Sequence, residues 1–121
     1  AGTPGNAGSI SWFEDLIIYN ILNSGVPDGV LREFYDSSIG PLAEYDRENK
    51  TELLESLEIY LLENRSISAA AARLYIHRNT MNYRINKIKQ ILSVDFDDSE
   101  NLLKLQLGIK IMRVLKGLGM K

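Results

Sequence analysis

The sequence predicts an all-α fold, a compact multi-helix domain of six or seven helices that contains a helix-turn-helix. Apolar residues recur along most of the chain at the spacing of a helix that buries one face. Residues that cap helices stand at the start of these stretches. The alternation of apolar and polar residues that is typical of strands occurs nowhere. A length of 121 residues suits one domain with a modest core.

The chain opens with a stretch that we do not expect to fold. Residues 1–9 (AGTPGNAGS) are small and offer no apolar anchor, so we interpret them as a flexible linker or a remnant left by cloning. The helical domain is predicted over residues 10–121. Its first helix is expected to begin with the capping-box pair Ser11 and Glu14 and to end near Leu22.

Proline and cap residues divide the next part of the chain into three helices. We expect a short helix over residues 28–37 and another over residues 41–45, because a proline such as residue 41 suits the first turn of a helix. Asn49 and Glu52 have the spacing of a further cap. The helix that follows them carries apolar residues at helical spacing, namely Leu53, Leu54, Leu57, Tyr60 and Leu61.

Three more helices complete the predicted fold. An Ala-rich helix is expected to begin at Ser68 and to end at Leu74, and a longer helix runs from Arg78 to about Leu92. The acidic sequence at residues 97–99 starts the last helix, because negative charge is favourable at a helix N-terminus. That helix extends through about residue 116, where glycines follow.

Composition excludes several classes of protein. The chain has no cysteine and one histidine, so we expect neither disulfides nor a metal site, and no cofactor. No apolar run approaches the roughly 20 residues that cross a bilayer, and no signal segment is recognisable. We therefore expect a cytoplasmic protein without a membrane partner.

Charge is strongly segregated along the chain, although the net charge is only −2. Residues 1–64 carry 3 basic and 12 acidic side chains, whereas residues 65–92 carry 6 basic side chains and no acidic one. Residues 93–100 contribute −4, and residues 101–121 contribute +5. Because salt screens charges beyond about 10 Å, a local basic patch can attract phosphate even on an acidic protein.

The functional prediction depends on residues 66–92 (SISAAAARLYIHRNTMNYRINKIKQIL). Four small residues at 69–72 let another helix cross at close range, as in a helix-turn-helix. The turn at residues 75–77 follows, with Ile76 expected in the core and Tyr75 expected to be half-buried. The alternative interpretation is two core helices with a solvated outer face. The absence of any acid in this stretch disfavours it, because a solvated face usually mixes both signs.

The second helix of the motif has two chemically distinct faces at about 100° per residue. One face is an apolar stripe of Met81, Ile85, Ile88 and Leu92. The opposite face carries Asn79, Tyr83, Asn86 and Gln90, with cations on its flanks. Amides can read base edges in the major groove, while cations neutralise phosphates. The N-terminal part of such a helix meets the bases.

These considerations predict a set of DNA contacts and no catalytic or metal-binding residue. Base contacts are predicted for Arg78, Asn79, Asn82, Tyr83 and Asn86. Phosphate contacts are predicted for Ser68, His77, Thr80, Arg84, Lys87 and Lys89.

The same stretch resembles the C-terminal helix-turn-helix of bacterial PucR/CdaR transcription regulators. The resemblance is carried by residues 74–80 (LYIHRNT) together with Tyr83, Arg84 and Ile88, and it extends over roughly residues 28–116. Further matching segments are residues 45–49, 53–57 and 95–98. The resemblance implies a regulator of catabolic, purine-related or sugar-acid genes that works as a homodimer or higher oligomer. It also implies a sensory region before this domain, so the chain looks like the output module of a longer protein.

Three features allow more than one interpretation. His77 is expected to cap a helix or contact phosphate, since no catalytic partner accompanies it. The acidic turn at residues 95–100 lacks the glycine and terminal glutamate of an EF-hand, so we interpret it as a helix-capping turn rather than a calcium site. The last helix is apolar on more than one face and forms either intramolecular core or a dimer surface. The first helix, with Trp12, Leu16 and Tyr19, poses the same question.

Two hypotheses for function remain. The first is a sequence-specific reader of double-stranded DNA that inserts residues 78–92 into the major groove, with two copies on a two-fold site supplying affinity. Asn82 and Asn86 replace cations that are common in relatives, which predicts weak binding by one copy. The second is a helical protein-interaction or dimerisation module with little intrinsic DNA affinity. No catalytic constellation is present, so we do not expect an enzyme, nor a small molecule bound by this domain.

Overall fold

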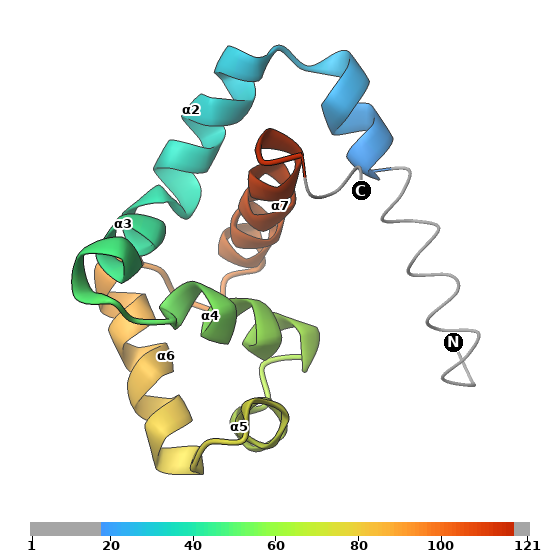
Figure 1. Cartoon of the computed structure of the whole chain (residues 1–121). Helices are drawn as coiled ribbons and strands as arrows, with labels where there is room; N and C mark the ends of the chain where they lie inside the picture. The colour runs from blue at the N-terminus through green and yellow to red at the C-terminus, as the bar shows by residue number, and fades with distance from the viewer. Residues whose placement is uncertain (1–17, 118–121) are drawn as a thin grey trace, which may run out of the picture.

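The computed structural model of the chain describes residues 18–117, and this range consists of helices and the loops between them (Figure 1). The helices are a first one seen over residues 18–25, followed by α2 (Asp28–Ser38), α3 (Gly40–Asn49), α4 (Leu53–Leu62), α5 (Ile67–Leu74), α6 (Arg78–Leu92) and α7 (Ser99–Leu115). The described residues contain no strand, and the predicted all-α fold is confirmed.

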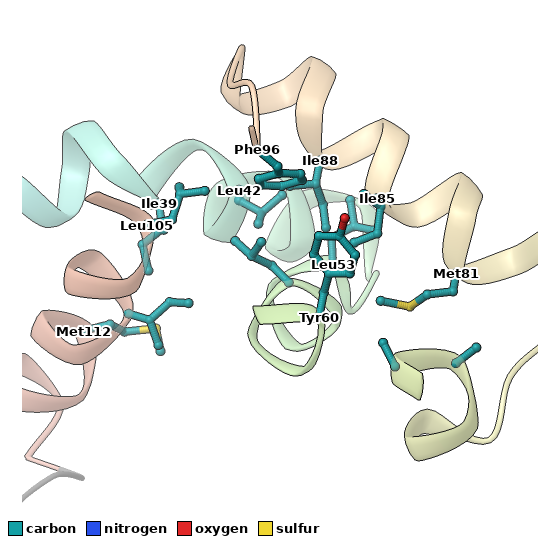
Figure 2. Packing of buried hydrophobic residues seen from close by; sticks show 14 residues of the cluster. Ile39, Leu42, Leu53, Tyr60, Met81, Ile85, Ile88, Phe96, Leu105 and Met112 are labelled. Carbon is teal, nitrogen blue, oxygen red and sulfur yellow. The ribbon is translucent and has the colours of Figure 1, made fainter. Parts of the chain in front are cut away.

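The main hydrophobic core surrounds α4, which crosses the molecule between α7 on one side and α5 and α6 on the other (Figure 1). Figure 2 shows Leu53 and Tyr60 of α4 facing Ile85 and Ile88 of α6. Side chains from five helices and the α6–α7 loop complete the cluster, including Leu42, Ala70, Ala71, Met81, Phe96, Leu105 and Met112. Burial of each large aliphatic side chain contributes about 1.5–3 kcal/mol, so this cluster is what holds the helices of the motif in place.

The last helix, α7, is covered on two sides. Leu105, Ile109 and Met112 belong to the core around α4, whereas Ile111 forms a second cluster with Leu22 and Leu31. Most of the apolar surface of α7 is therefore intramolecular core, as one of the two interpretations predicted. Leu103 is an exception among the large apolar residues of this helix, because 55% of its surface is exposed.

Two helix boundaries differ from the prediction around Asp46. The short helix expected over residues 41–45 continues to Asn49 as α3. Asn49 therefore cannot cap the next helix, and the structure records no side-chain cap from Glu52. The Asp46 carboxylate replaces them, accepting hydrogen bonds from the backbone N–H groups of Leu53 at 2.9 Å and Leu54 at 2.8 Å. The expected cap at Asn49 was wrong because the acceptor that caps α4 is Asp46, seven positions before Leu53, a contact that the local spacing did not indicate.

The caps of the three later helices are local. The Ser66 hydroxyl accepts from the N–H of Ala69, so α5 begins at Ile67 and not at Ser68 as predicted. The Asp98 carboxylate caps α7 by accepting from the N–H of Glu100 at 2.8 Å. This confirms that acidic residues before the last helix form a helix-capping turn.

Some predictions fall on residues outside the described range. These are the linker at residues 1–9, the capping pair Ser11 and Glu14, and the side chains of Trp12 and Leu16. Within residues 18–117, no helix is both long enough and apolar enough to cross a membrane.

Candidate nucleic-acid interface

Helices α5 and α6 form the predicted helix-turn-helix, and a tight turn fixes the angle between them. The N–H of Tyr75 donates to the carbonyl of Ala72 at 3.2 Å, and the N–H of Ile76 donates to that of Ala71 at 3.0 Å. This is the Schellman arrangement, which ends a helix with one residue in the left-handed conformation. Tyr75 is that residue, with φ of 59°.

Tyr75 is not half-buried as predicted, because 95% of its surface is exposed. The turn explains the difference. The left-handed residue reverses the chain so that Ile76 packs against the core while the side chain before it points to solvent. The burial expected at this turn is therefore provided by Ile76 alone.

Helix α6 has the two faces that its sequence predicts. Met81, Ile85 and Ile88 are buried against α4 and α5, with at most 2% of their surface exposed. On α5, Ala70 and Ala71 are buried where the two helices cross, which small side chains allow. The outer face of α6 carries the exposed residues Arg78, Asn79, Thr80, Asn82, Tyr83, Asn86 and Gln90.

His77 caps α6, as one of its predicted roles required. Its Nδ1 accepts a hydrogen bond from the backbone N–H of Asn79 at 2.9 Å. A ring nitrogen that accepts must be unprotonated, which leaves the Nε2 N–H of the neutral ring as a donor. His77 is also exposed, so the capping role leaves one polar atom at the surface beside the first turn of α6.

Arg84 is turned toward the core of the motif. Its Nη1 donates at 2.9 Å to the hydroxyl of Ser56, a fully buried residue of α4. The Ser56 hydroxyl in turn donates to the carbonyl of Glu52 at 3.0 Å. This chain of hydrogen bonds connects α6 to α4, a structural role that sequence reasoning did not identify.

The two lysines of α6 lie over aromatic rings. Nζ of Lys87 is 5.4 Å from the centre of the Tyr45 ring, and Nζ of Lys89 is 5.7 Å from the centre of the Phe96 ring. Such cation–π contacts contribute about 0.5–1 kcal/mol at exposed sites. These two lysines therefore lie at the flanks of α6 rather than on its outer face.

Two other cations of residues 65–92 contact residues that lie beyond the ends of helices. Arg65 donates to the carbonyl of Phe96 at 3.0 Å and lies 3.6 Å from the Asp97 carboxylate. Arg73 forms an ion pair with Glu63 at 2.8 Å. Within the described part of the chain, Arg78 is the cation of residues 65–92 for which the structure records no partner. The outer face of α6 is thus rich in amides and poor in free cations.

Comparison with known proteins identifies this arrangement. Residues 53–111, from α4 into α7, match the PucR C-terminal helix-turn-helix domain. Residues 53–111 belong to the PucR family. The PucR domain thus includes both helices of the motif and the helix that carries Ser56. No solved structure matches the chain.

Relatives that share this PucR domain are regulators from Bacillus subtilis (strain 168). The proline-responsive transcriptional activator PutR is 37% identical over 114 residues, which is 93% of this chain and 28% of PutR. The purine catabolism regulatory protein is 38% identical over 85 residues, 70% of this chain and 16% of that protein. The DNA-binding transcriptional activator AdeR is 30% identical over 99 residues, 82% of this chain and 24% of AdeR. The chain thus spans less than a third of each of these three relatives.

The family establishes a general role. A PucR helix-turn-helix is a DNA-binding domain of a transcription regulator, and the relatives point to a regulator rather than an enzyme. The predicted family and the predicted helix-turn-helix are confirmed at this level.

Proposed function

We propose that this chain binds specific sequences of double-stranded DNA by placing α6 in the major groove. The observation that supports the proposal is the composition of the exposed face of α6. It presents Asn79, Asn82, Tyr83 and Asn86 opposite the three buried residues of the apolar stripe. Because the buried stripe prevents the helix from rotating, these polar groups have a fixed direction, as sequence reading requires.

The base contacts that we propose are made by Arg78, Asn79, Asn82, Tyr83 and Asn86. An amide can bond adenine N6 and N7 together, and an arginine can bond guanine O6 and N7. Arg78 and Asn79 occupy the first turn of α6, the part of a recognition helix that reaches the bases. We therefore expect these two residues to carry most of the sequence preference.

The phosphate contacts that we propose surround this face, and each has a donor to spare. Arg84 uses one guanidinium nitrogen for Ser56, and an arginine has five N–H donors. His77 keeps its Nε2 N–H, while Ser68 and Thr80 are exposed hydroxyls. Lys87 and Lys89 can exchange a weak ring contact for a phosphate.

One copy of the chain should bind weakly, because few cations are free and because α3 and α4, which pack against α6, carry more acidic than basic residues. We propose that the protein acts as a homodimer or higher oligomer, so that two copies of α6 engage a two-fold site. The relatives named for proline response and purine catabolism suggest control of catabolic genes. We place the regulator in the cytoplasm, where bacterial DNA lies.

The test is selection of bound sequences from a random duplex pool, followed by a salt titration of the selected duplex. We expect one enriched sequence motif and an affinity that falls steeply with salt. Arg78→Ala and Asn79→Ala should abolish the preference while circular dichroism shows an unchanged helix content. Asn23→Ala, at an exposed asparagine of the first helix, is the matched control and should bind like the wild type.

A second candidate function is a protein-interaction module. It is favoured by a groove of about 290 Å³ between the first helix, α4 and α7, lined in part by Tyr19, Leu61, Leu62 and Ile109. Leu62 exposes 59% of its surface beside this groove. If no sequence is enriched at low salt, even with two copies artificially joined, DNA reading is excluded and this second function becomes the better account.

A further inference from the structure

Tyr75 has an unfavourable backbone conformation and a side chain that is almost fully exposed to solvent. Its φ of 59° lies in the left-handed region, which glycine adopts without cost and a tyrosine does not. Its surface is 95% exposed, and the structure records no hydrogen bond or ring contact of its side chain with any residue of 18–117. An aromatic residue at this position therefore adds nothing visible to the fold, which suggests a role in contacting something else.

The place of Tyr75 indicates what it contacts. It lies between α5 and α6, two positions before His77 and three before Arg78. Both ends of the turn are fixed, since Ile76 packs against the core and the two Schellman hydrogen bonds hold the backbone. The phenol is therefore presented from a rigid position at the end of the motif where α6 begins. In a helix-turn-helix this end lies where the first helix crosses the DNA backbone.

The chemistry of the surrounding residues favours a phosphate as the ligand. Arg73 is paired with Glu63, so of the two arginines within three positions of Tyr75 only Arg78 has no partner recorded in the described part of the chain. A phenol O–H donates well to an anionic oxygen, and tyrosines commonly contact DNA phosphates. Its ring can also lie against the neighbouring sugar, burying apolar surface that is exposed in the free protein.

We infer that Tyr75 donates its phenol O–H to a phosphate of bound DNA, beside the point where the N-terminus of α6 enters the groove. This inference rests on the proposed DNA-binding function and adds a positioning residue outside α6. Because the donor is neutral, it releases no counterion. Tyr75 should therefore strengthen binding without changing its dependence on salt, in contrast to Lys87, a proposed phosphate contact that carries charge.

Two variants of the 121-residue chain test the inference, with a duplex chosen by selection and a scrambled duplex of equal length as probes. Tyr75→Phe removes only the hydroxyl and should weaken binding about tenfold, the effect of one hydrogen bond to a charged group. The loss should be the same on both duplexes, with an unchanged slope of log affinity against log salt. Lys87→Ala, at a proposed phosphate contact, should lower the magnitude of that slope by about 1.

Tyr75→Gly separates the fold from the function. It removes the whole side chain and relieves the left-handed backbone, so thermal stability should rise while DNA affinity falls. Ser93→Gly is the matched control, because Ser93 is an exposed residue with φ of 53° at the other end of α6. It should also raise stability, and it should leave affinity unchanged.

The outcomes distinguish this inference from the proposed function. If Tyr75→Phe binds both duplexes like the wild type, or loses affinity on the selected duplex alone, a phosphate contact is overturned. If Asn79→Ala does not change the preference but Tyr75→Phe still weakens binding to both duplexes, specific reading fails and the Tyr75 contact stands. Absence of any DNA binding by the wild type overturns both.

Discussion

Asp46 is a residue of α3 that determines where α4 begins. Its carboxylate accepts hydrogen bonds from the N–H groups of Leu53 and Leu54 and from the hydroxyl of Thr51 at 2.6 Å. It thus satisfies two of the N–H groups that the first turn of a helix leaves without a partner. It also brings negative charge to that N-terminus. One side chain therefore connects two helices that the core requires.

Removing this carboxylate should lower the stability of the domain. We expect Asp46→Ala to reduce the free energy of unfolding by about 1–2 kcal/mol, the usual cost of a lost cap. Asp46→Asn should cost less, because its amide oxygen still accepts. Urea denaturation followed by circular dichroism measures both. Asp36→Ala, at an exposed acid of α2, is the control, and an equal loss there would contradict a capping role.

Arg84 combines a structural contact with a proposed contact to DNA, and the two can be separated. Arg84→Met should lower the free energy of unfolding by about 1 kcal/mol, because the buried Ser56 hydroxyl loses a partner. It should also lower the magnitude of the salt slope of DNA binding by about 1, through the lost charge. Ser56→Ala should destabilise the domain similarly and leave the slope unchanged. A slope that does not change in Arg84→Met would show that Arg84 does not contact phosphate.

At the scale of elements, the approach of α7 to the junction between α2 and α3 depends on Gly108. A Cβ atom built there would lie 2.3 Å from the Ser38 hydroxyl oxygen and 3.1 Å from the Ser38 Cβ. Both residues lie where Ile39 enters the core. The absence of a side chain at this position therefore lets the two helices pack closely.

Gly108→Ala should consequently destabilise the domain despite the better helix propensity of alanine. We expect the free energy of unfolding to fall by about 1–3 kcal/mol, the usual cost of overpacking. Gly29→Ala is the matched control, because Gly29 lies in α2 with nothing within 4 Å of its added Cβ. That variant should gain up to about 1 kcal/mol. Thermal denaturation of the two variants measures both changes in stability. A stabilised Gly108→Ala would show that α7 can shift without cost.

At the scale of the whole molecule, charge separates the proposed DNA-binding face from the rest. Residues 65–92 carry no acid, while α2, α3 and α4 are rich in acids. Helices α5 and α6 lie at the end of the molecule away from the first helix (Figure 1). The first helix and α2 should therefore be directed away from DNA, which leaves them available for contact with the rest of a longer protein or with a second copy.

This geometry predicts a strong effect of joining two copies. A chain fused to a parallel coiled coil should bind a duplex with two inverted copies of the selected sequence about 10²–10⁴-fold more tightly than the single chain. The gain should require a centre-to-centre spacing of about 10 base pairs or a multiple of it. Gel-shift titrations over a series of spacings measure this. Equal affinity at all spacings would contradict two-fold recognition.

The sequence by itself determined the fold class, the family and the faces of α6. These features are local, since helical periodicity and the spacing of Met81, Ile85 and Ile88 are set by neighbours along the chain. The caps at Asp98 and His77 were also recognisable, because each bonds a backbone N–H two residues away. The exposed amides opposite the apolar stripe followed from the same spacing.

The tertiary structure alone decided which side chains are held by contacts within the fold and which are free to contact a ligand. Arg65 meets Phe96, a residue 31 positions away, and Arg84 meets Ser56, 28 positions away. The cap at Asp46 and the exposure of Tyr75 depend on the path of the backbone through a turn. Contacts of this kind leave no periodic signal, because they arise only when packing of the core brings distant segments together.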